Sequence, residues 1–342
     1  MTSWWDDNTG TVRCDESSWL AAATGIGAGD PAGGVQRSGD STPTTSVRAF
    51  AAYHASDDAA FPGSRTVCRA PPGRHRVRVD ADNLRLTVAA LRSAGCIAAE
   101  EEAAELAAAA SDQHQLRELL KRRCTGEPLA WLLGRVDFCG ERVIVTPGVY
   151  VPRWQTEKLA REAAARLPAE GVAVDLCTGS GAVAVVMRRL RPKARVLGTE
   201  VDPSAAACAR ANGVEVFEGD LDAGLPAGIR GLVDVVTAVV PYVPTSELAF
   251  LPRDVTTYEP VAALDGGRDG LRVLVPSVTA ASRLLRPGGS LLLEVGGDQA
   301  RQLAPVLRQH GFSTIRVSLD EEGDLRAVYC RRDKGHSRRR RL

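Results

Sequence analysis

The sequence predicts an α/β protein, in which helices cover both faces of a mostly parallel sheet and a small helical domain precedes the sheet. Two observations support this prediction. From residue 172 onward, short apolar runs alternate with segments of helical period, the pattern of strands joined by crossover helices. Upstream, apolar residues recur at helical spacing, as Leu84, Val88 and Leu91 do. In such a sheet, ligands bind at the carboxyl ends of the strands.

The chain has 342 residues, which is enough for about two domains. Residues 1–80 are expected to form a disordered or irregular extension, because Gly, Ser, Thr, Asp and Pro dominate much of it and leave little apolar surface to offset the entropy of ordering. The helical domain is expected over residues 81–140 and the sheet domain over residues 141–332. Residues 333–342 form a basic tail, for which disorder is expected.

Within the helical domain, the first helix carries the stripe of Leu84, Val88 and Leu91. Residues 98–110 are rich in Ala and Glu and predict a second helix, and Ser111-Asp112 offers an N-cap to a third. After this domain, a short extended piece over residues 142–145 ends in a Thr-Pro-Gly turn, and a helix is expected around residues 156–167.

The sheet domain continues with alternating elements. The sequence predicts strands at residues 172–176, 195–199, 214–217, 233–239, 290–295, 314–318 and 326–330, and helices at residues 182–190, 203–212, 271–285 and 298–310. Because no helix separates the last two strands, they are expected to form an antiparallel hairpin at one edge. Pro276 falls inside one predicted helix, which is therefore expected to begin later or to be kinked.

The amino-acid composition limits the classes of molecule that the protein is expected to bind. The 43 Lys and Arg residues and the 42 Asp and Glu residues leave a formal charge of +1, so no overall field attracts the protein to nucleic acid or to an anionic membrane. The 8 cysteines form no C-x-x-C pair and share no spacing with histidines, so no metal site is indicated. The N-terminus is acidic, and no apolar run reaches the ~18 residues of a membrane span, so a cytoplasmic location is expected.

A glycine-bearing turn follows the strand at residues 172–176. Gly179 and Gly181 allow the backbone to approach a ligand closely, and the helix that follows presents free N–H groups. The turn fits a dinucleotide fingerprint only in the form that accepts alanine as the third glycine. Asp175 precedes the turn and Glu200 ends the next strand, where a carboxylate can accept both hydroxyls of a ribose. Alternatively, Asp175 caps the turn and Glu200 is solvated.

A third acidic residue, Asp220, follows the next strand, where an adenine amino group could be recognised. Three acidic positions at successive strand ends resemble the S-adenosylmethionine pocket of class I methyltransferases, and the turn contains no Lys or Arg to bind a phosphate. This resemblance implies S-adenosylmethionine as the cofactor. The residues expected to bind it are Asp175, Cys177, Thr178, Gly179, Gly181, Glu200, Val201, Asp220, Leu221 and Val239.

The strand at residues 233–239 runs into Val239-Val240-Pro241-Tyr242. From about residue 84 to 332, the chain resembles the HemK/PrmC family of release-factor glutamine N(5)-methyltransferases. The segments that carry the resemblance include Gly126-Glu127-Pro128-Leu129, Val151-Pro152-Arg153 with Thr156-Glu157, the turn from Asp175 to Gly181, Glu259-Pro260, Gly266-Gly267, Arg286-Pro287-Gly288-Gly289, and Glu294 with Gly296 and Gln299.

The resemblance implies a Rossmann-like class I methyltransferase with a seven-stranded, mostly parallel sheet and an antiparallel edge hairpin. It also implies that the helical domain recognises the substrate, and that a glutamine in the Gly-Gly-Gln loop of a peptide-chain release factor is methylated. Arg153, Thr156, Glu157 and Glu259 are expected to line the cleft for the cofactor and the acceptor. For Arg153 and Glu157, an ordinary surface pair one helical turn apart is an equal alternative.

The sequence departs from the family at the acceptor motif, which reads Asn-Pro-Pro-Tyr in relatives. Here Val239 and Val240 occupy the first two places, so the predicted catalytic segment is Val239, Val240, Pro241 and Tyr242. In the family, the Asn side chain accepts one N–H of the substrate amide, and the next backbone carbonyl accepts the other. Val240 keeps its carbonyl, but Val239 has no side-chain acceptor. Losing such a partner costs about 1–3 kcal/mol, and more where the partner also fixes the orientation of the substrate, so the rate on a glutamine acceptor is expected to be lower by about 10- to 1000-fold.

This departure leaves two alternatives open. One is methylation of another nitrogen, on a nucleic-acid amino group or a small molecule. The other is a cofactor-binding protein with little turnover. A role for nucleic acid is otherwise expected only through the basic tail, which could contact RNA.

Overall fold

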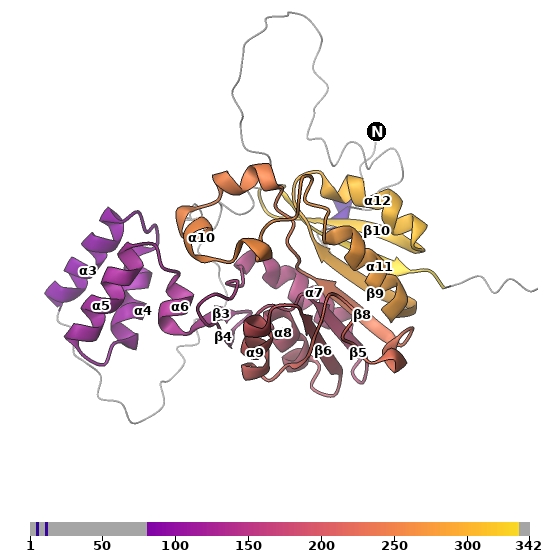
Figure 1. Cartoon of the computed structure of the whole chain (residues 1–342), viewed down its shortest axis with the longest axis horizontal. Coiled ribbons are helices and arrows are strands. Elements are labelled where there is room, and N and C mark those ends of the chain that lie inside the picture. The colour runs from indigo at the N-terminus through magenta and orange to yellow at the C-terminus, as the bar shows by residue number, and fades with distance from the viewer. Residues whose placement is uncertain (1–4, 7–10, 13–80, 335–342) are drawn as a thin grey trace, which may run out of the picture.

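The computed structural model describes residues 5–6, 11–12 and 81–334. The irregular structure predicted for residues 1–80 therefore lies almost entirely outside the described residues, as does the predicted disorder of the tail beyond residue 334. Figure 1 shows the helical domain at one end of the molecule and the twisted sheet with its helices at the other.

The helical domain consists of α3 (Ala81–Ser93), α4 (Ala99–Ala109), α5 (Gln113–Cys124) and the short α6 (Leu129–Leu133). These helices have an apolar core of their own, with Leu91, Leu106 and Leu116 buried at its centre. The predicted N-cap is present, because the Asp112 carboxylate accepts a 2.8 Å hydrogen bond from the backbone N–H of Gln115.

A two-stranded antiparallel hairpin joins the helical domain to the sheet domain. It comprises β3 (Arg135–Phe138) and β4 (Glu141–Ile144), so the boundary expected at residue 140 falls in its turn. Asn212 holds the hairpin against the sheet domain. Its side chain accepts a hydrogen bond from the N–H of Ile144 and donates to the carbonyls of Ile144 and Ser180, each at 2.8 Å.

The large sheet has the order β1-β2-β10-β11-β9-β8-β5-β6-β7 among the described residues. Its strands are β1 (Trp5–Asp6), β2 (Thr11–Val12), β5 (Val172–Leu176), β6 (Arg195–Glu200), β7 (Glu215–Glu218), β8 (Val233–Ala238), β9 (Leu285–Glu294), β10 (Phe312–Leu319) and β11 (Leu325–Arg332). The five strands from β9 to β7 pair in parallel, whereas β10 and β11 form an antiparallel hairpin beside β9. The predicted mostly parallel, seven-stranded sheet with an antiparallel edge hairpin is confirmed, and β1 and β2 extend its edge beyond β10.

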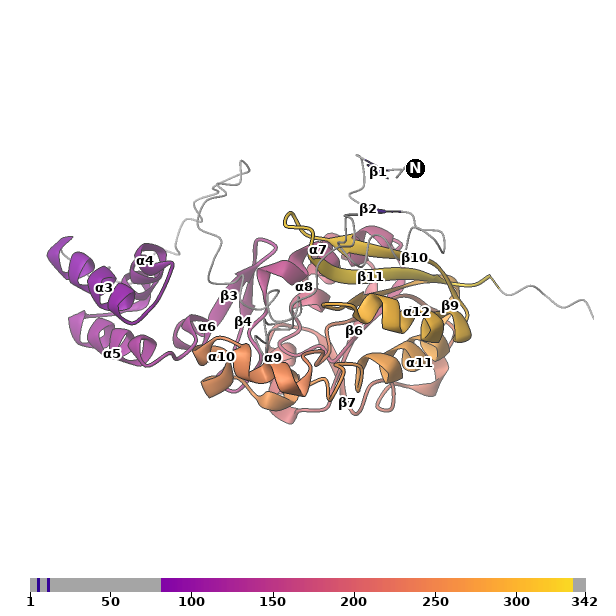
Figure 2. The same cartoon turned by 90° about the horizontal axis from the view of Figure 1, so that it is seen from above.

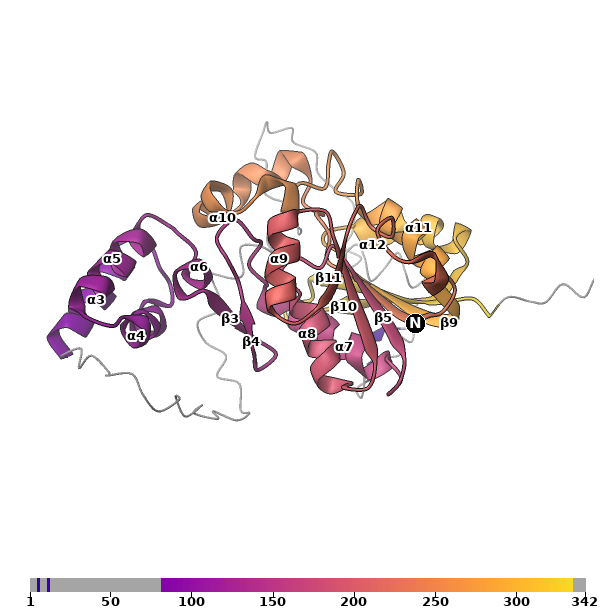
Figure 3. The ribbon, with the colours of Figure 1, turned by 60° about the horizontal axis from the view of Figure 1, so that its bottom comes forward.

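Helices cover both faces of this sheet, as Figures 2 and 3 show. One face packs against α7 (Glu157–Arg166), α8 (Ala182–Leu190) and α9 (Pro203–Ala211), and the other against α11 (Leu274–Leu284) and α12 (Gln299–Gln309). Alternate residues of one strand serve the two faces: Val235 packs with the first group and Val236 with the second. Because both faces are covered, the parallel strands read as continuous apolar runs.

The helix predicted over residues 271–285 begins at Leu274, so Pro276 lies in its first turn, where a missing N–H breaks no helical hydrogen bond. The segment between β8 and α11 carries two 3₁₀ turns, Thr245–Phe250 and Val261–Ala263, with α10 (Arg253–Tyr258) between them. A further 3₁₀ turn, Trp154–Thr156, directly precedes α7. Figures 1 and 2 both place α10 beside the helical domain. In the part of the chain that the structure describes, no helix has the length and apolarity needed to span a membrane.

Candidate active site

Four predicted segments begin side by side at one edge of the sheet. Leu176, the last residue of β5, is aligned with Ala238 of β8 on one side and with Thr199 of β6 on the other. Glu200 at the end of β6 is in turn aligned with Glu218 of β7. The turn that begins at residue 177, the acidic position 200, residues 219–221 and the segment from residue 239 therefore all leave the sheet at its carboxyl edge.

The turn after β5 is held by hydrogen bonds to β6. The N–H of Thr178 donates to the carbonyl of Thr199 at 2.9 Å, and the N–H of Gly179 donates to Oε2 of Glu200 at 2.8 Å. Gly179 has φ +57°, and nothing lies within 4 Å of the position that a Cβ would take. Gly181 has φ +85°, but its Cβ would meet Val214 at 2.9 Å. Gly179 thus faces open space, whereas Gly181 permits close helix packing.

Asp175 is buried, and both of its carboxylate oxygens have partners. Oδ2 accepts the Thr178 hydroxyl and Oδ1 accepts the Thr237 hydroxyl, each at 2.6 Å. Burial raises the pKa of Asp175 to about 6, against the opposing effect of these two hydrogen bonds. This geometry matches the alternative in which Asp175 caps the turn, because the residue ties the turn to β8.

Glu200 is also buried, so it is not the solvated carboxylate of the alternative interpretation. Its Oε1 accepts the N–H groups of Val201 and Asp202 at 2.9 and 3.1 Å, and its Oε2 accepts the N–H of Gly179. A carboxylate oxygen has two lone pairs, so Oε2 can accept one further hydrogen bond. Beside it, the apolar side chain of Val201 is 66% exposed.

The remaining predicted cofactor residues differ in exposure. Asp220 is exposed, whereas Leu221 is buried and has a positive φ of 49°. Cys177 also has a positive φ, of 53°, and burial raises the pKa of its thiol strongly. These two non-glycine residues in the left-handed region stand in the loops that follow β5 and β7, a strained conformation typical of functional sites.

The acceptor segment leaves β8 at Val239, which is half-buried and packs against the core, and Val240 is buried. Further along, the N–H of Val243 donates to the carbonyl of Leu264, and the carbonyl of Val243 accepts the N–H of Gly266. These bonds join the segment to the loop at residues 264–267.

Tyr242 lies at the centre of a buried polar network. Its hydroxyl donates to Oε1 of Glu294 at 3.1 Å, and its backbone carbonyl accepts the side-chain amide of Gln299 at 2.7 Å. The other oxygen of Glu294 accepts the Thr156 hydroxyl at 2.6 Å. Burial raises the pKa of both Tyr242 and Glu294, so the tyrosine remains a neutral donor. The ring is therefore held by its own partners, which makes Tyr242 a positioning residue for the segment.

The four residues expected to line the cleft do not form one cluster: Arg153 contacts Glu259, whereas Thr156 and Glu157 contact other residues. Arg153 and Glu259 form a buried ion pair, and Oε2 of Glu259 also accepts the N–H of Val151 at 3.1 Å. Burial raises the pKa of Glu259, and the charge of Arg153 opposes this shift. The alternative surface pair of Arg153 and Glu157 is not formed. Instead, Glu157 pairs with Arg161 and accepts the N–H of Cys139.

No protein-family model matches the chain. A release factor glutamine methyltransferase of Geobacter sulfurreducens is 39% identical over 221 residues, which cover 62% of this chain and 76% of that protein. A release factor glutamine methyltransferase of Mycolicibacterium smegmatis is 38% identical over 221 residues, covering 63% and 78% of the two chains. The chain belongs to the release factor glutamine methyltransferase (HemK/PrmC) family.

Another relative of this methyltransferase is named for a different activity. The 4-amino-L-phenylalanine/4-methylamino-L-phenylalanine methyltransferase of Streptomyces pristinaespiralis is 38% identical over 203 residues, covering 56% of this chain and 69% of that protein. Among solved structures, a methyltransferase from Pyrococcus furiosus aligns with a TM-score of 0.42 and 19% identity, over 58% of this chain and 90% of that one. Because the chain belongs to the family of these methyltransferases and has the sheet order described above, the protein is an enzyme with the class I methyltransferase fold.

Three residues that the methyltransferase site brings together were not among the predicted site residues, namely Thr237, Glu294 and Gln299. For Glu294 and Gln299 a signal existed, because both stand in segments that resemble the family. In addition, Leu293 of β9 is aligned with Ala238 of β8, which places Glu294 beside the start of the acceptor segment. Within residues 81–334, no group of acidic, His and Cys side chains has an arrangement that could hold a metal ion.

Proposed function

We propose that this protein transfers a methyl group from S-adenosylmethionine to the side-chain amide nitrogen of a glutamine in a peptide-chain release factor. One observation carries the proposal: the open turn at Gly179 lies between the acidic end of β6 and the Val239–Tyr242 segment, at a single edge of the sheet. A cofactor bound at the turn would thus have the acceptor segment as its neighbour.

The side chains at this edge fit S-adenosylmethionine, which supplies an electrophilic methyl group on a sulfonium and has no phosphate. The free lone pair of Glu200 Oε2 suits a ribose hydroxyl, and exposed Val201 offers an apolar surface to adenine. Asp220 is exposed near the start of the loop that follows β7, where an amino group can donate to it. The turn itself has no cation and has open space at Gly179, which lets the backbone approach a ligand.

The acceptor segment suits an amide nitrogen in one respect. An amide lone pair is delocalised, so the nitrogen must be held in line with the methyl group. Within residues 81–334, no hydrogen bond reaches the carbonyl oxygen of Val240, which is therefore available to accept one amide N–H. Pro241 favours an extended backbone at Val240, and the bonds from Tyr242 to Glu294 and from Gln299 to Tyr242 hold this loop before any substrate arrives.

The test uses labelled S-adenosylmethionine and a purified release factor. We expect label on the glutamine of the Gly-Gly-Gln loop, and its loss in Gly179→Arg, whose side chain would fill the open space at the turn. Gly140→Arg is the matched control, since Gly140 also has a positive φ and open surroundings but lies in the β3–β4 hairpin. Label on no residue of the release factor, with tight cofactor binding, would refute this acceptor.

A second acceptor class, the aromatic amines, is favoured by Val239. An arylamine nitrogen is more nucleophilic than an amide nitrogen, so its methylation depends less on a second hydrogen-bond acceptor, and its flat ring tolerates an apolar neighbour such as Val239. The relative from Streptomyces pristinaespiralis is named for such an acceptor, 4-amino-L-phenylalanine. Methylation of that compound but not of a release factor would select this function. The formal charge of +1 disfavours the nucleic-acid alternative.

A further inference from the structure

Two successive residues at the end of α10 contact different parts of the molecule. Tyr258 is the last residue of α10, and Glu259 caps it in an extended conformation, with φ −74° and ψ 147°. Tyr258 reaches the helical domain, whereas Glu259 reaches the segment before α7. These two contacts join the helical domain to the candidate active site through one short stretch of backbone.

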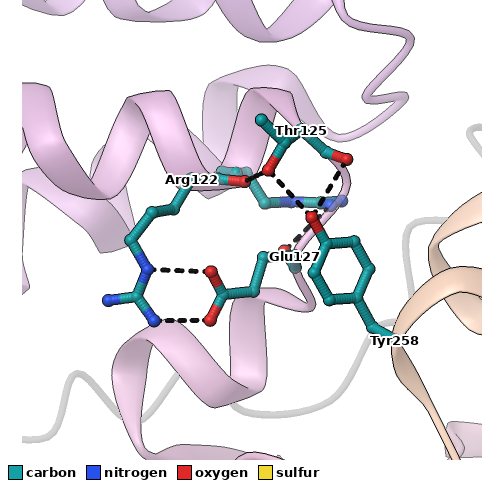
Figure 4. A network of polar contacts seen from close by, with 5 residues as sticks. Arg122, Thr125, Glu127 and Tyr258 are labelled. Carbon is teal, nitrogen blue, oxygen red and sulfur yellow. Dashed lines mark hydrogen bonds and ion pairs between the residues drawn. The ribbon is translucent and has the colours of Figure 1, made fainter.

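Figure 4 shows the contact of Tyr258 with the turn after α5. The Tyr258 hydroxyl lies 2.9 Å from Oγ1 of Thr125 and donates to the Thr125 carbonyl at 3.3 Å, while the threonine hydroxyl bonds to the carbonyl of Arg122 at 2.7 Å. Gly126 has φ +96°, and its missing Cβ would lie 3.6 Å from the tyrosine ring. The ring also meets Trp131 edge to face, with centroids 6.4 Å apart.

The turn that Tyr258 contacts is itself fixed within the helical domain. Glu127 receives two hydrogen bonds from the guanidinium of Arg122, one of them 2.8 Å long (Figure 4). The buried Arg123 donates to the carbonyl of Glu127 at 3.3 Å and forms a bidentate pair with Glu102 of α4, at 2.6 and 3.0 Å. A displacement of the turn would therefore carry the helical domain with it.

On the other side, Glu259 continues the connection to the site. Its carboxylate binds Arg153 and the N–H of Val151, as described above. Five residues later, the carbonyl of Leu264 accepts the N–H of Val243, which follows the acceptor segment directly. A continuous set of contacts thus runs from Thr125 to the loop that carries Tyr242.

We propose that Tyr258 is a positioning residue that sets the helical domain at a fixed orientation to the acceptor segment, and that this matters for a folded protein acceptor. This proposal rests on the proposed function, methylation of a release factor. A protein acceptor touches both the helical domain and the acceptor segment, so it gains from their fixed orientation. A short peptide that reaches only the acceptor segment gains nothing from it.

The kinetic test compares Tyr258→Phe with wild type on an intact release factor and on a short peptide carrying its Gly-Gly-Gln loop. Loss of one exposed hydroxyl contact predicts a fall in kcat/KM of about 3- to 10-fold on the protein, mostly through KM. Turnover of the peptide and the Kd of S-adenosylmethionine are expected to be unchanged. Tyr329→Phe, on β11, is the matched control and should alter neither acceptor. Equal losses on protein and peptide, or no loss on either, would overturn the proposal.

A second measurement does not depend on activity. Amide hydrogen exchange of Thr125–Trp131 and of α10 is expected to be at least about 3-fold faster in Tyr258→Phe than in wild type, because the hydroxyl no longer ties the two segments. The effects of Thr125→Val and Tyr258→Phe on this exchange should be less than additive, since both remove the contact between the two hydroxyls, and Thr125→Val in addition removes the bond to the Arg122 carbonyl. Unchanged exchange in Tyr258→Phe would overturn the proposed role of Tyr258, whatever the activity of the wild type. If the wild type methylated neither the release factor nor the peptide, that result would count against the proposed function and not against the role of Tyr258.

Discussion

Tyr242 and Glu294 stand at the carboxyl ends of neighbouring parallel strands, and the hydroxyl of the first donates to the buried carboxylate of the second. The two strands come from parts of the chain that are far apart in sequence. This hydrogen bond holds the side chain of Tyr242, and the side-chain amide of Gln299 holds the backbone carbonyl of the same tyrosine. The loop is therefore organised by the core of the protein, which is what in-line transfer to a weak nucleophile requires.

The first prediction concerns this contact. Tyr242→Phe leaves Oε1 of Glu294 without its donor in a dry site, so the free energy of unfolding should fall by about 1–3 kcal/mol and kcat should fall with it. Thr156→Val removes the donor on the other oxygen and should cost similar stability with a smaller effect on kcat. Urea unfolding and steady-state kinetics measure both. A Tyr242→Phe protein with wild-type stability would show that the hydrogen bond contributes nothing.

The second prediction concerns the space around the same tyrosine. Gly270 has φ +74°, and a Cβ there would lie 2.1 Å from Nε2 of Gln299 and 2.3 Å from the Tyr242 carbonyl oxygen. Gly270→Ala should therefore break the Gln299 bond and destabilise the fold by more than about 2 kcal/mol, as thermal and urea unfolding would show. Gly228→Ala is the control, because nothing lies within 4 Å of its Cβ position. Equal stability of the two variants would contradict the crowding seen at Gly270.

A third prediction separates cofactor binding from backbone strain. Gly179→Ala and Gly140→Ala both place a side chain at positive φ in open space, so each should lose about 1–2 kcal/mol of stability. Only Gly179→Ala should weaken binding of S-adenosylmethionine, by about 10-fold or more, because its methyl group stands where the ligand approaches the turn. Isothermal titration measures the Kd of S-adenosylmethionine for both variants. Equal Kd values would show that Gly179 does not lie in the cofactor site.

The fourth prediction is a pH dependence. Burial raises the pKa of Asp175 from 3.8 to about 6, so the folded protein holds this proton more tightly than the unfolded chain. The stabilisation is complete below about pH 4 and is lost as the pH rises through about 6. A shift of this size corresponds to about 3 kcal/mol. The difference in unfolding free energy between wild type and Asp175→Asn should therefore decrease by about that amount from pH 4 to 7.

The control for this pH series has the opposite sign. The bidentate hydrogen bonds from Arg283 lower the pKa of Asp222, so its contribution is present above the unfolded pKa and is lost as the pH falls in the acid range. The Asp222→Asn variant should therefore be less stable than wild type near neutral pH, and this difference in unfolding free energy should disappear at low pH. For Asp175→Asn, the difference from wild type should instead grow as the pH falls. A flat difference curve for Asp175→Asn would mean that the carboxyl titrates normally.

The fifth prediction tests the acceptor. Val239→Asn supplies a side-chain oxygen at the end of β8, and glutamine methylation should rise by about 10- to 1000-fold if the rest of the site is intact. Val239→Leu has the same branching at Cγ as Asn but no polar atom, so it should give no increase. Label transfer to a release factor measures the rates. If Val239→Asn and Val239→Leu methylated glutamine at equal rates, any increase over wild type would come from the changed shape of the side chain and not from the added oxygen. That result would count against a glutamine amide as the natural acceptor.

The sequence by itself determined the elements of the sheet domain, because periodicity is a local property of the chain. The strand Val172–Leu176 and the helix Ala182–Leu190 have the bounds that their apolar patterns predict, and the cap at Asp112 is where its side chain indicates. The edge hairpin followed from the missing helix between the last two strands. The family resemblance likewise came from short segments in a fixed order.

Only the tertiary structure decided which polar groups meet. Glu157 pairs with Arg161 and not with Arg153, and the carboxylate that holds Tyr242 comes from a strand 52 residues later. The hydroxyl of Tyr258 finds its partner 133 residues earlier, across the two domains. No local pattern encodes such pairs, because they depend on strand order and on the path of the connecting loops. Burial then sets their energies and pKa values, and burial is itself a product of the completed fold.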